Sequence, residues 1–127
     1  MVNSQAFSGS ITIKNSSFKQ FLNASVAGNF KGTQSRNFTI VDCDLSSNFQ
    51  GIFLESQVSM FFNVFHSRLT NNQYGINAGK IDQQALLSVD NTTFTNNNIV
   101  AIVVNNGSII LSNTQWYKFI ILLFINQ

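Results

Sequence analysis

The chain has 127 residues, a length that predicts one domain with a hydrophobic core of its own. Charged residues make up only 9% of it and the net charge is +2, which excludes the strongly basic surface of proteins that bind nucleic acids or anionic membranes. The seven Lys and Arg residues are scattered along the chain, whereas a nucleic-acid site would cluster them. We therefore expect no nucleic-acid partner.

The first ten residues, MVNSQAFSGS, have neither a basic start nor an apolar stretch as long as a secretory signal needs. This predicts either that the protein is not secreted by that route or that the chain is a fragment. We expect residues 1–8 to form an irregular or partial cap and residues 9–127 to form the domain. The single cysteine, Cys43, excludes an internal disulfide.

One pattern of apolar and polar positions then occurs five times, in copies that begin near residues 11, 38, 62, 87 and 109. The last large apolar residue of each copy can be taken as its anchor. The anchors are Phe18, Leu45, Leu69, Phe94 and Trp116. They are separated by 27, 24, 25 and 22 residues, a period that is typical of solenoid proteins.

Fixed positions around each anchor carry the same kind of residue. The positions seven and five residues before it are always apolar, and a spacing of two places both side chains on one face of a strand. Three residues before the anchor stand Asn15, Asp42, His66, Asn91 and Asn113. Three residues after it stand Phe21, Asn48, Asn72, Asn97 and Phe119. Asparagine tolerates left-handed backbone, so both positions are suited to corners.

A second apolar segment follows the second corner, as in residues 51–54 and 101–104. Each copy therefore predicts a strand, a corner, a short strand at the anchor, a second corner, a third strand and a variable loop. Three short strands per turn indicate an all-β, single-stranded parallel β-helix solenoid of about five coils. Equivalent residues would stack about 4.7 to 4.9 Å apart, and side-chain amides could form ladders along the axis.

Two other repeat architectures fit less well. In a leucine-rich repeat the asparagine follows the pattern L-x-x-L-x-L-x-x-N, whereas here the polar residue comes two positions after the second apolar one. An array of amphipathic helices is disfavoured because Ile, Val, Phe, Thr and Asn are poor helix formers.

The runs NSSFKQ, NTTFTNNN and DLSSNFQGI resemble right-handed parallel β-helix repeats of the pectin-lyase-like superfamily. The likeness is strongest to the degenerate repeats of polymorphic outer-membrane proteins and of large surface proteins of ciliates, and it covers roughly residues 9–125. The resemblance implies a right-handed coil. It implies no particular activity, because the superfamily contains lyases, hydrolases, adhesins and inert spacers.

One group of charged residues could carry chemistry. Asp42 and Asp44 of the second copy occupy the same two positions as His66 and Arg68 of the third, so stacking would place Asp42 beneath His66 and Asp44 beneath Arg68. Carboxylates beside a histidine and an arginine are similar to the acid/base residues of β-helix polygalacturonases and lyases. The catalytic blocks of that family (N-T-D, D-D, G-H-G and R-I-K) are missing, so we favour structural contacts between coils over catalysis.

Other chemistry has little support in the sequence. No nucleophile motif, phosphate loop or metal-ligand spacing occurs, so we expect no cofactor and no metal. Among five N-x-S/T sequons, Asn37 and Asn106 are the better glycosylation sites because they adjoin predicted loops. The sequons favour an extracellular or cell-surface location.

The apolar run at residues 119–125 is far shorter than the roughly 20 residues that span a bilayer, so we expect no transmembrane span. We interpret it as the second corner and third strand of coil five; a hydrophobic cap or contact surface is the alternative. Neither end of the repeat carries a polar cap, so the ends are expected to pair with further coils or with another chain.

We predict a non-catalytic structural or adhesive module, a fragment of a larger surface protein that contacts carbohydrate or protein. Loops at residues 28–37 and 79–84 are the candidate binding loops. One alternative is a carbohydrate-active enzyme of the pectate lyase or polygalacturonase type, or its inactive remnant. Another is a truncated gene product without a function of its own.

Overall fold

The computed structural model describes residues 2–4, 10–31, 36–117 and 122–125, and these form sixteen β-strands and no helix. The first strands of the five copies are β2 (Ser10–Lys14), β5 (Arg36–Val41), β8 (Met60–Phe65), β11 (Leu86–Asp90) and β14 (Ser108–Ser112). The short anchor strands are β3 (Ser17–Lys19), β6 (Asp44–Ser46), β9 (Arg68–Thr70), β12 (Thr93–Thr95) and β15 (Gln115–Tyr117). The third strands are β4 (Ala24–Phe30), β7 (Gln50–Ser56), β10 (Tyr74–Lys80), β13 (Val100–Asn105) and β16 (Leu122–Ile125), and β1 (Val2–Ser4) precedes them.

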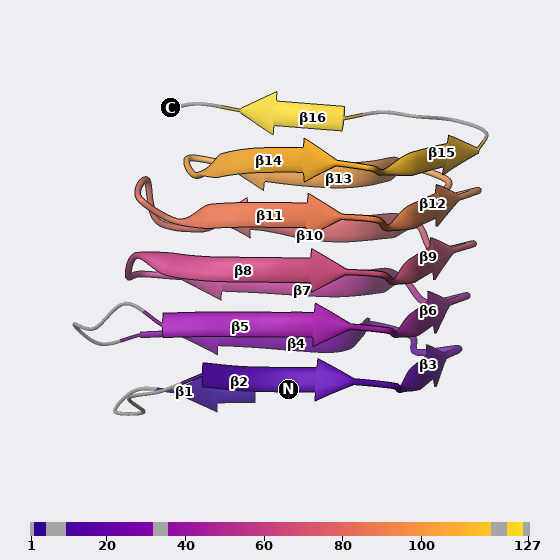
Figure 1. Ribbon diagram of the computed structural model, residues 1–127, viewed down its shortest axis with the longest axis horizontal. Coiled ribbons are helices and arrows are strands. Elements are labelled where there is room, and N and C mark those ends of the chain that lie inside the picture. The colour runs from indigo at the N-terminus through magenta and orange to yellow at the C-terminus, as the bar shows by residue number, and fades with distance from the viewer. Residues whose placement is uncertain (1, 5–9, 32–35, 118–121, 126–127) are drawn as a thin grey trace.

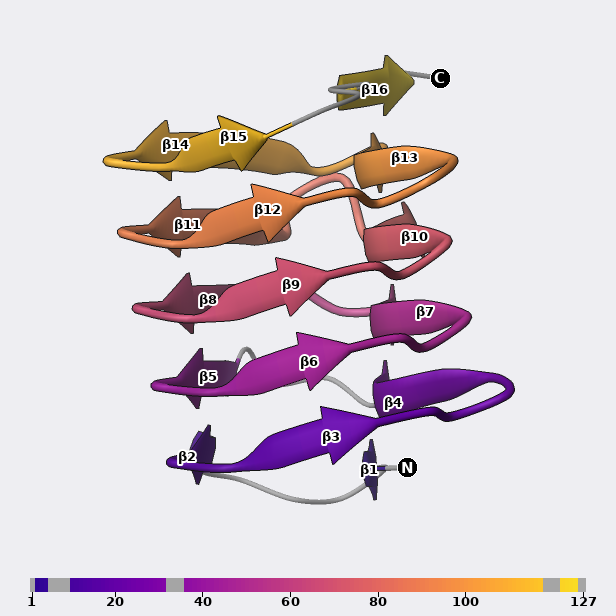
Figure 2. The same cartoon turned by 90° about the vertical axis from the view of Figure 1, so that its right-hand side faces the viewer.

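The strands form three sheets in which every pairing is parallel. The first strands form one sheet of five, the anchor strands a second sheet of five, and β1 joins the third strands in a sheet of six. Figures 1 and 2 show the copies stacked as successive turns, and from β2 to β14 the chain completes about four turns. The predicted parallel β-solenoid is confirmed; its right-handedness stays a prediction.

Equivalent residues form columns that run along the solenoid axis. The anchors pair in register, with Leu45 opposite Leu69 and Phe94 opposite Trp116. Inward-facing residues of the middle copies are sealed from solvent: Val64 is 1% exposed and Val89 is 0% exposed. The core is therefore a stack of apolar layers, one for each coil, as the alternation in the sequence predicted.

The two corners differ in how they turn the chain. At the first corner the polar residue itself has left-handed backbone, with φ of 55° at Asp42 and 49° at His66. At the second corner the left-handed residue is one position earlier than expected, for example Asn71 with φ of 55°. Its neighbour Asn72 is not a turn residue at all: its side chain is fully buried.

The buried asparagines of the second corner form a ladder that crosses three coils. The Asn48 backbone N–H donates to the side-chain oxygen of Asn72 (2.9 Å), and the Asn72 N–H donates to that of Asn97 (3.2 Å). The Asn72 amide also donates to the Leu45 carbonyl at 3.0 Å. At the corner, backbone N–H and C=O groups lack the partners that a sheet would supply, and the uncharged asparagine side chains provide hydrogen bonds to them instead.

Both candidate binding loops are smaller than predicted. Much of residues 28–37 belongs to β4 and β5, because Phe30 is buried against Phe38 and Phe62. Residues 32–35 lie outside the described part of the chain. The segment 79–84 is held close to the solenoid because Ile81 is only 3% exposed and packs in the core.

The two ends of the chain also contain regular structure. Within the predicted cap, β1 pairs with β4, while residues 5–8 lie outside the described ranges. Within the C-terminal apolar run, β16 pairs with β13 as the expected third strand of coil five. Residues 118–121, including Phe119, lie outside the described ranges.

Candidate functional site

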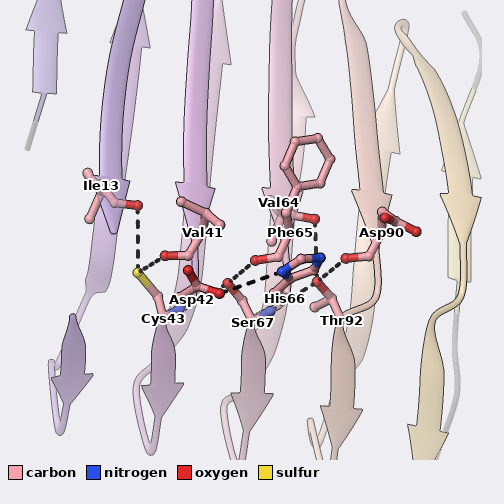
Figure 3. Close-up of polar contacts among 10 residues, drawn as sticks. All are labelled: Ile13, Val41, Asp42, Cys43, Val64, Phe65, His66, Ser67, Asp90 and Thr92. Carbon is pink, nitrogen blue, oxygen red and sulfur yellow. Dashed lines mark hydrogen bonds and ion pairs between the residues drawn. The ribbon is translucent and has the colours of Figure 1, made fainter. Parts of the chain in front are cut away.

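The predicted contact between Asp42 and His66 is present at the first corner. Both residues sit in left-handed turns on neighbouring coils, and Nδ1 of His66 lies 3.6 Å from Oδ1 of Asp42 (Figure 3). About half of each side chain is exposed, 55% for His66 and 50% for Asp42. The pair borders a shallow depression of about 460 Å³ that Asp44 and Arg68 also line.

The second predicted pair is stacked but is not an ion pair. Asp44 lies opposite Arg68 in the register of β6 and β9, yet the contact that Asp44 makes is with Lys19, at 3.8 Å. The other carboxylate oxygen of Asp44 is buried and has no hydrogen-bond partner among the described residues. The four charged residues therefore share a surface without forming the linked acid/base group that the sequence suggested.

A column of small polar side chains lies beneath this surface and fixes the corner. The Ser67 hydroxyl accepts a hydrogen bond from the Cys43 N–H (3.2 Å), and the Thr92 hydroxyl accepts one from the Ser67 N–H (3.4 Å). Each side chain also donates to carbonyls of the preceding strands, as Figure 3 shows for Cys43 with Ile13 and Val41. This column was not predicted from the sequence, although the position two residues before each anchor is always Ser, Cys or Thr.

A third carboxylate, Asp90, stands one coil further along. Its Oδ1 accepts hydrogen bonds from the Ser112 hydroxyl (2.6 Å) and the Asn113 amide (2.9 Å). These two hydrogen bonds lower the pKa of Asp90 from its usual value of 3.8, and the nearby His66 adds a smaller effect in the same direction. Asp90 is thus held as a carboxylate, which makes it unsuited to act as a general acid near neutral pH.

The chemistry available at the first corner is limited. Asp42 can orient the imidazole of His66, but Asp44 and Asp90 are engaged elsewhere. Across the part of the chain that the structure describes, no three His, Cys, Asp or Glu side chains are grouped so that they could hold a metal ion.

The second corner carries a different surface, which is uncharged and partly apolar. A depression of about 480 Å³ is lined by Gln20, Phe21, Leu22, Ser47, Asn48, Phe49, Asn71 and Gln73. Phe21 is 45% exposed, Phe49 46% and Leu22 98%. We refer to Phe21, Leu22 and Phe49, with the amides of Gln20, Asn71 and Gln73, as the aromatic corner.

The asparagine ladder explains why Phe21 is on the surface. Phe21 occupies the ladder position of the first copy, and its N–H still donates to the side-chain oxygen of Asn48 at 3.0 Å. Its ring remains half exposed beside Phe18, with centroids 6.5 Å apart. On the next coil Phe49 follows Asn48 directly and packs edge-on against Tyr74, with centroids 5.7 Å apart.

Sequence reasoning did not identify the aromatic corner. Its one signal was phenylalanine at a position where the middle copies have asparagine. The exposure of Phe49 depends on the direction in which the turn after Asn48 leaves the corner, and no periodic pattern encodes that direction.

The two preferred sequons lie in different environments. Asn37 is exposed on β5, where its side chain faces away from the core. Asn106 is half-buried in the turn between β13 and β14 and has φ of 73°. Asn37 therefore offers the more accessible amide for a glycan.

Comparisons with known proteins returned no match to any protein-family model, curated protein or solved structure. In the described ranges, no helix has the length and apolar character that crossing a membrane requires.

Proposed function

We propose that this chain is a non-catalytic structural or adhesive β-helix module of a larger cell-surface protein, and that its aromatic corner contacts carbohydrate or protein. The observation that carries this proposal is the grouping of Phe21, Leu22 and Phe49 on one edge of the solenoid. Large apolar side chains with a polar rim are typical of binding surfaces.

The chemistry of the aromatic corner suits an uncharged ligand. Among the described residues, no charged side chain lines the depression. The ring faces of Phe21 and Phe49 can stack on the apolar face of a sugar, and the amides of Asn71 and Gln73 can both donate to and accept from its hydroxyls. A protein partner would use the same rings as anchors.

The proposal that the module belongs to a cell-surface protein is supported by the resemblance of its repeats to pectin-lyase-like, right-handed β-helices of surface proteins. Glycosylation at Asn37, and less favourably at Asn106, belongs to the same proposal and would place the module outside the cell. Intact-mass analysis of protein secreted from a eukaryotic host, with an Asn37→Gln control, tests the modification.

The binding proposal is tested on an array of immobilised neutral oligosaccharides and purified extracellular-matrix proteins. Phe49→Ala should weaken binding to any positive probe about tenfold or more, because it removes a central aromatic anchor. Phe61→Ala is the matched control, since Phe61 is 44% exposed on β8, outside the aromatic corner. Equal effects of the two substitutions, or none from Phe49→Ala, would contradict the proposal.

The contact between Asp42 and His66 supports a second candidate, a carbohydrate-active enzyme or its remnant. In that case, replacing both Asp42 and Asp44 with asparagine should abolish cleavage of the polysaccharide substrate. Full retention of cleavage by the double variant would rule out this site as catalytic.

A further inference from the structure

The two ends of the solenoid differ in shape. The third-strand sheet has six strands and the other two sheets have five, because β1 lies one coil beyond β2 and β3. At the opposite end, β14, β15 and β16 make up a complete coil (Figure 2). A second copy stacked head to tail does not fit this end. With its β2 and β3 on β14 and β15, its β1 would take the place of β16, and with its β1 on β16 it would leave β14 and β15 unpaired.

The strands of the fifth coil run in directions that suit a two-fold axis. Figure 1 shows β14 and β16 pointing in opposite directions, and Figure 2 shows β15 crossing from one to the other. A half-turn about an axis parallel to β14 therefore brings β14 of one copy beside β16 of the other, antiparallel, and brings β15 beside its own equivalent. We propose that two copies of this chain form a closed dimer through these three strand edges.

The backbone hydrogen bonds of β15 determine the register of this contact. The Gln115 N–H donates to the Thr92 carbonyl (3.0 Å). The Tyr117 carbonyl accepts from the Asn96 N–H (3.1 Å). Successive residues of a strand direct their N–H and C=O groups to opposite sides, so those of Trp116 face the open edge. In the dimer Trp116 lies opposite Trp116 of the second copy, and the two residues exchange both N–H···O=C hydrogen bonds.

The edge of β14 offers backbone groups in the same way. The Ser108 N–H donates to a carbonyl of the preceding coil at 2.9 Å, and the Ser112 carbonyl accepts from an N–H of that coil at 3.1 Å. By the same alternation, the N–H and C=O groups of Ile109 and Leu111 face the open edge. Among the described strands, β16 pairs with β13 alone, so its other edge is available to receive these groups.

The apolar layer of the fifth coil has a neighbour on one side only. Leu111 and Trp116 are partly buried, whereas Val89 and Phe94 in the same columns of coil four are 0% and 2% exposed. One face of the Trp116 indole stacks on Phe94, with centroids 4.7 Å apart and 15° between the ring planes. Because Trp116 lies at the two-fold axis, the indole of the second copy would cover its other face.

The charges of the two ends also favour this choice of edge. Exposed lysines prevent edge strands from pairing, and the first coil carries Lys14 on β2 and Lys19 on β3. In coil five, by contrast, no residue of the described ranges 108–117 and 122–125 is charged. The chain also has no proline, so every residue of these edges except the N-terminal one retains its N–H. The end formed by coil five can therefore meet itself without like-charge repulsion.

The contact leaves the aromatic corner open. The residues of the aromatic corner belong to the first three coils, whereas the dimer contact uses the fifth. The dimer proposal therefore does not depend on what the aromatic corner binds.

A two-fold contact is closed, so it predicts a dimer and no larger assembly. Analytical ultracentrifugation of the whole chain should show a mean mass that rises with concentration and levels off at two copies. A monomer at every concentration, or a mass that continues to rise beyond two copies, would overturn the proposal.

Charge substitutions test which edges meet. With Trp116 on the axis, position 115 of one copy lies beside position 117 of the other. Both side chains are exposed, so Gln115→Glu/Tyr117→Glu should fold, but it brings like charges together at two places and should weaken association about fivefold or more. An equimolar mixture with Gln115→Lys/Tyr117→Lys should restore association.

The matched control is Thr93→Glu/Thr95→Glu, which changes the same columns one coil further from the contact. The glutamate at position 93 would lie beside Arg68, so this variant should also fold. Equal association of the two glutamate variants would overturn the proposal.

Disulfide trapping determines the orientation. In a Cys43→Ser background, a mixture of Gln115→Cys and Tyr117→Cys chains should form the mixed disulfide, because directly opposed residues of antiparallel strands lie within bonding range. No mixed disulfide, or preferential linkage of Gln115→Cys to Ser17→Cys in the same column of β3, would overturn the proposal. Serine is suitable at position 43 because Ser67 occupies the same column.

Discussion

The side-chain nitrogen of Asn72 lies 3.1 Å from the side-chain oxygen of Asn97 on the next coil. Both residues are buried, and both bond to the backbone of neighbouring coils. The second corner is therefore held by uncharged amides, which leaves its outer surface free to carry the exposed rings of the aromatic corner.

Asn72→Leu should lower the free energy of unfolding by about 3 kcal/mol or more. The substitution keeps a similar volume but leaves the Asn48 N–H and the Leu45 carbonyl buried without partners. Urea denaturation measures the change, with Asn98→Leu as the exposed control. A loss below about 1 kcal/mol for Asn72→Leu would mean that the ladder does not stabilise the fold.

Thr92→Val should cost about 1–3 kcal/mol of stability, although the two side chains have the same shape. The hydroxyl of Thr92 accepts from the buried Ser67 N–H and donates to the Asp90 carbonyl, and valine can do neither. Thr92→Ser retains the hydroxyl and should cost less. If the serine variant is the less stable of the two, packing of the methyl group outweighs the hydrogen bonds.

Val89→Asp should prevent folding, because it would place an unpaired charge in a layer that is 0% exposed. Thr93→Asp, on the outer side of β12, should change stability by no more than about 0.5 kcal/mol. Far-UV circular dichroism and thermal unfolding of both variants test the assignment. Equal tolerance of the two substitutions would show that the register of coil four is wrong.

Asp90 should make stability depend on pH in the acidic range. Its pKa is lower in the folded chain than the usual 3.8, because Ser112 and Asn113 stabilise the carboxylate. The resulting stabilisation is complete above pH values near the unfolded pKa and is lost as pH falls through the lower, folded pKa. Comparing urea midpoints at neutral and acidic pH for the parent chain and Asp90→Asn isolates this effect. Identical pH dependence in both chains would contradict it.

The repeat allowed much of the fold to be predicted from the sequence. Leu87 and Val89 are two positions apart, and a polar residue and an anchor follow them. This pattern predicts a strand and a corner regardless of the length and sequence of the loops between copies. The same columns predicted that Asp42 would lie against His66, as it does at 3.6 Å. The period of the repeat determines the path of the backbone. The strands, the corners and the stacking of Asp42 and His66 follow from that path alone.

Features that depend on the direction of single side chains could not be predicted in this way. Asp44 is stacked on Arg68 as expected, but its carboxylate reaches Lys19. The position of Asn72 suggested a turn residue, yet the backbone turns at Asn71 and the Asn72 side chain enters the core. The column in which a residue lies determines which residues are its neighbours. The rotamer of its side chain then determines which of these neighbours it contacts.

The most direct test of the account is whether residues one coil apart are in contact in solution. Nuclear Overhauser effects should connect the methyl groups of Leu45 and Leu69, which are paired in register, and the stacked rings of Phe94 and Trp116. These contacts join residues more than 20 positions apart in the chain and require the solenoid. Their absence in folded protein would contradict the stacking, and with it the aromatic corner.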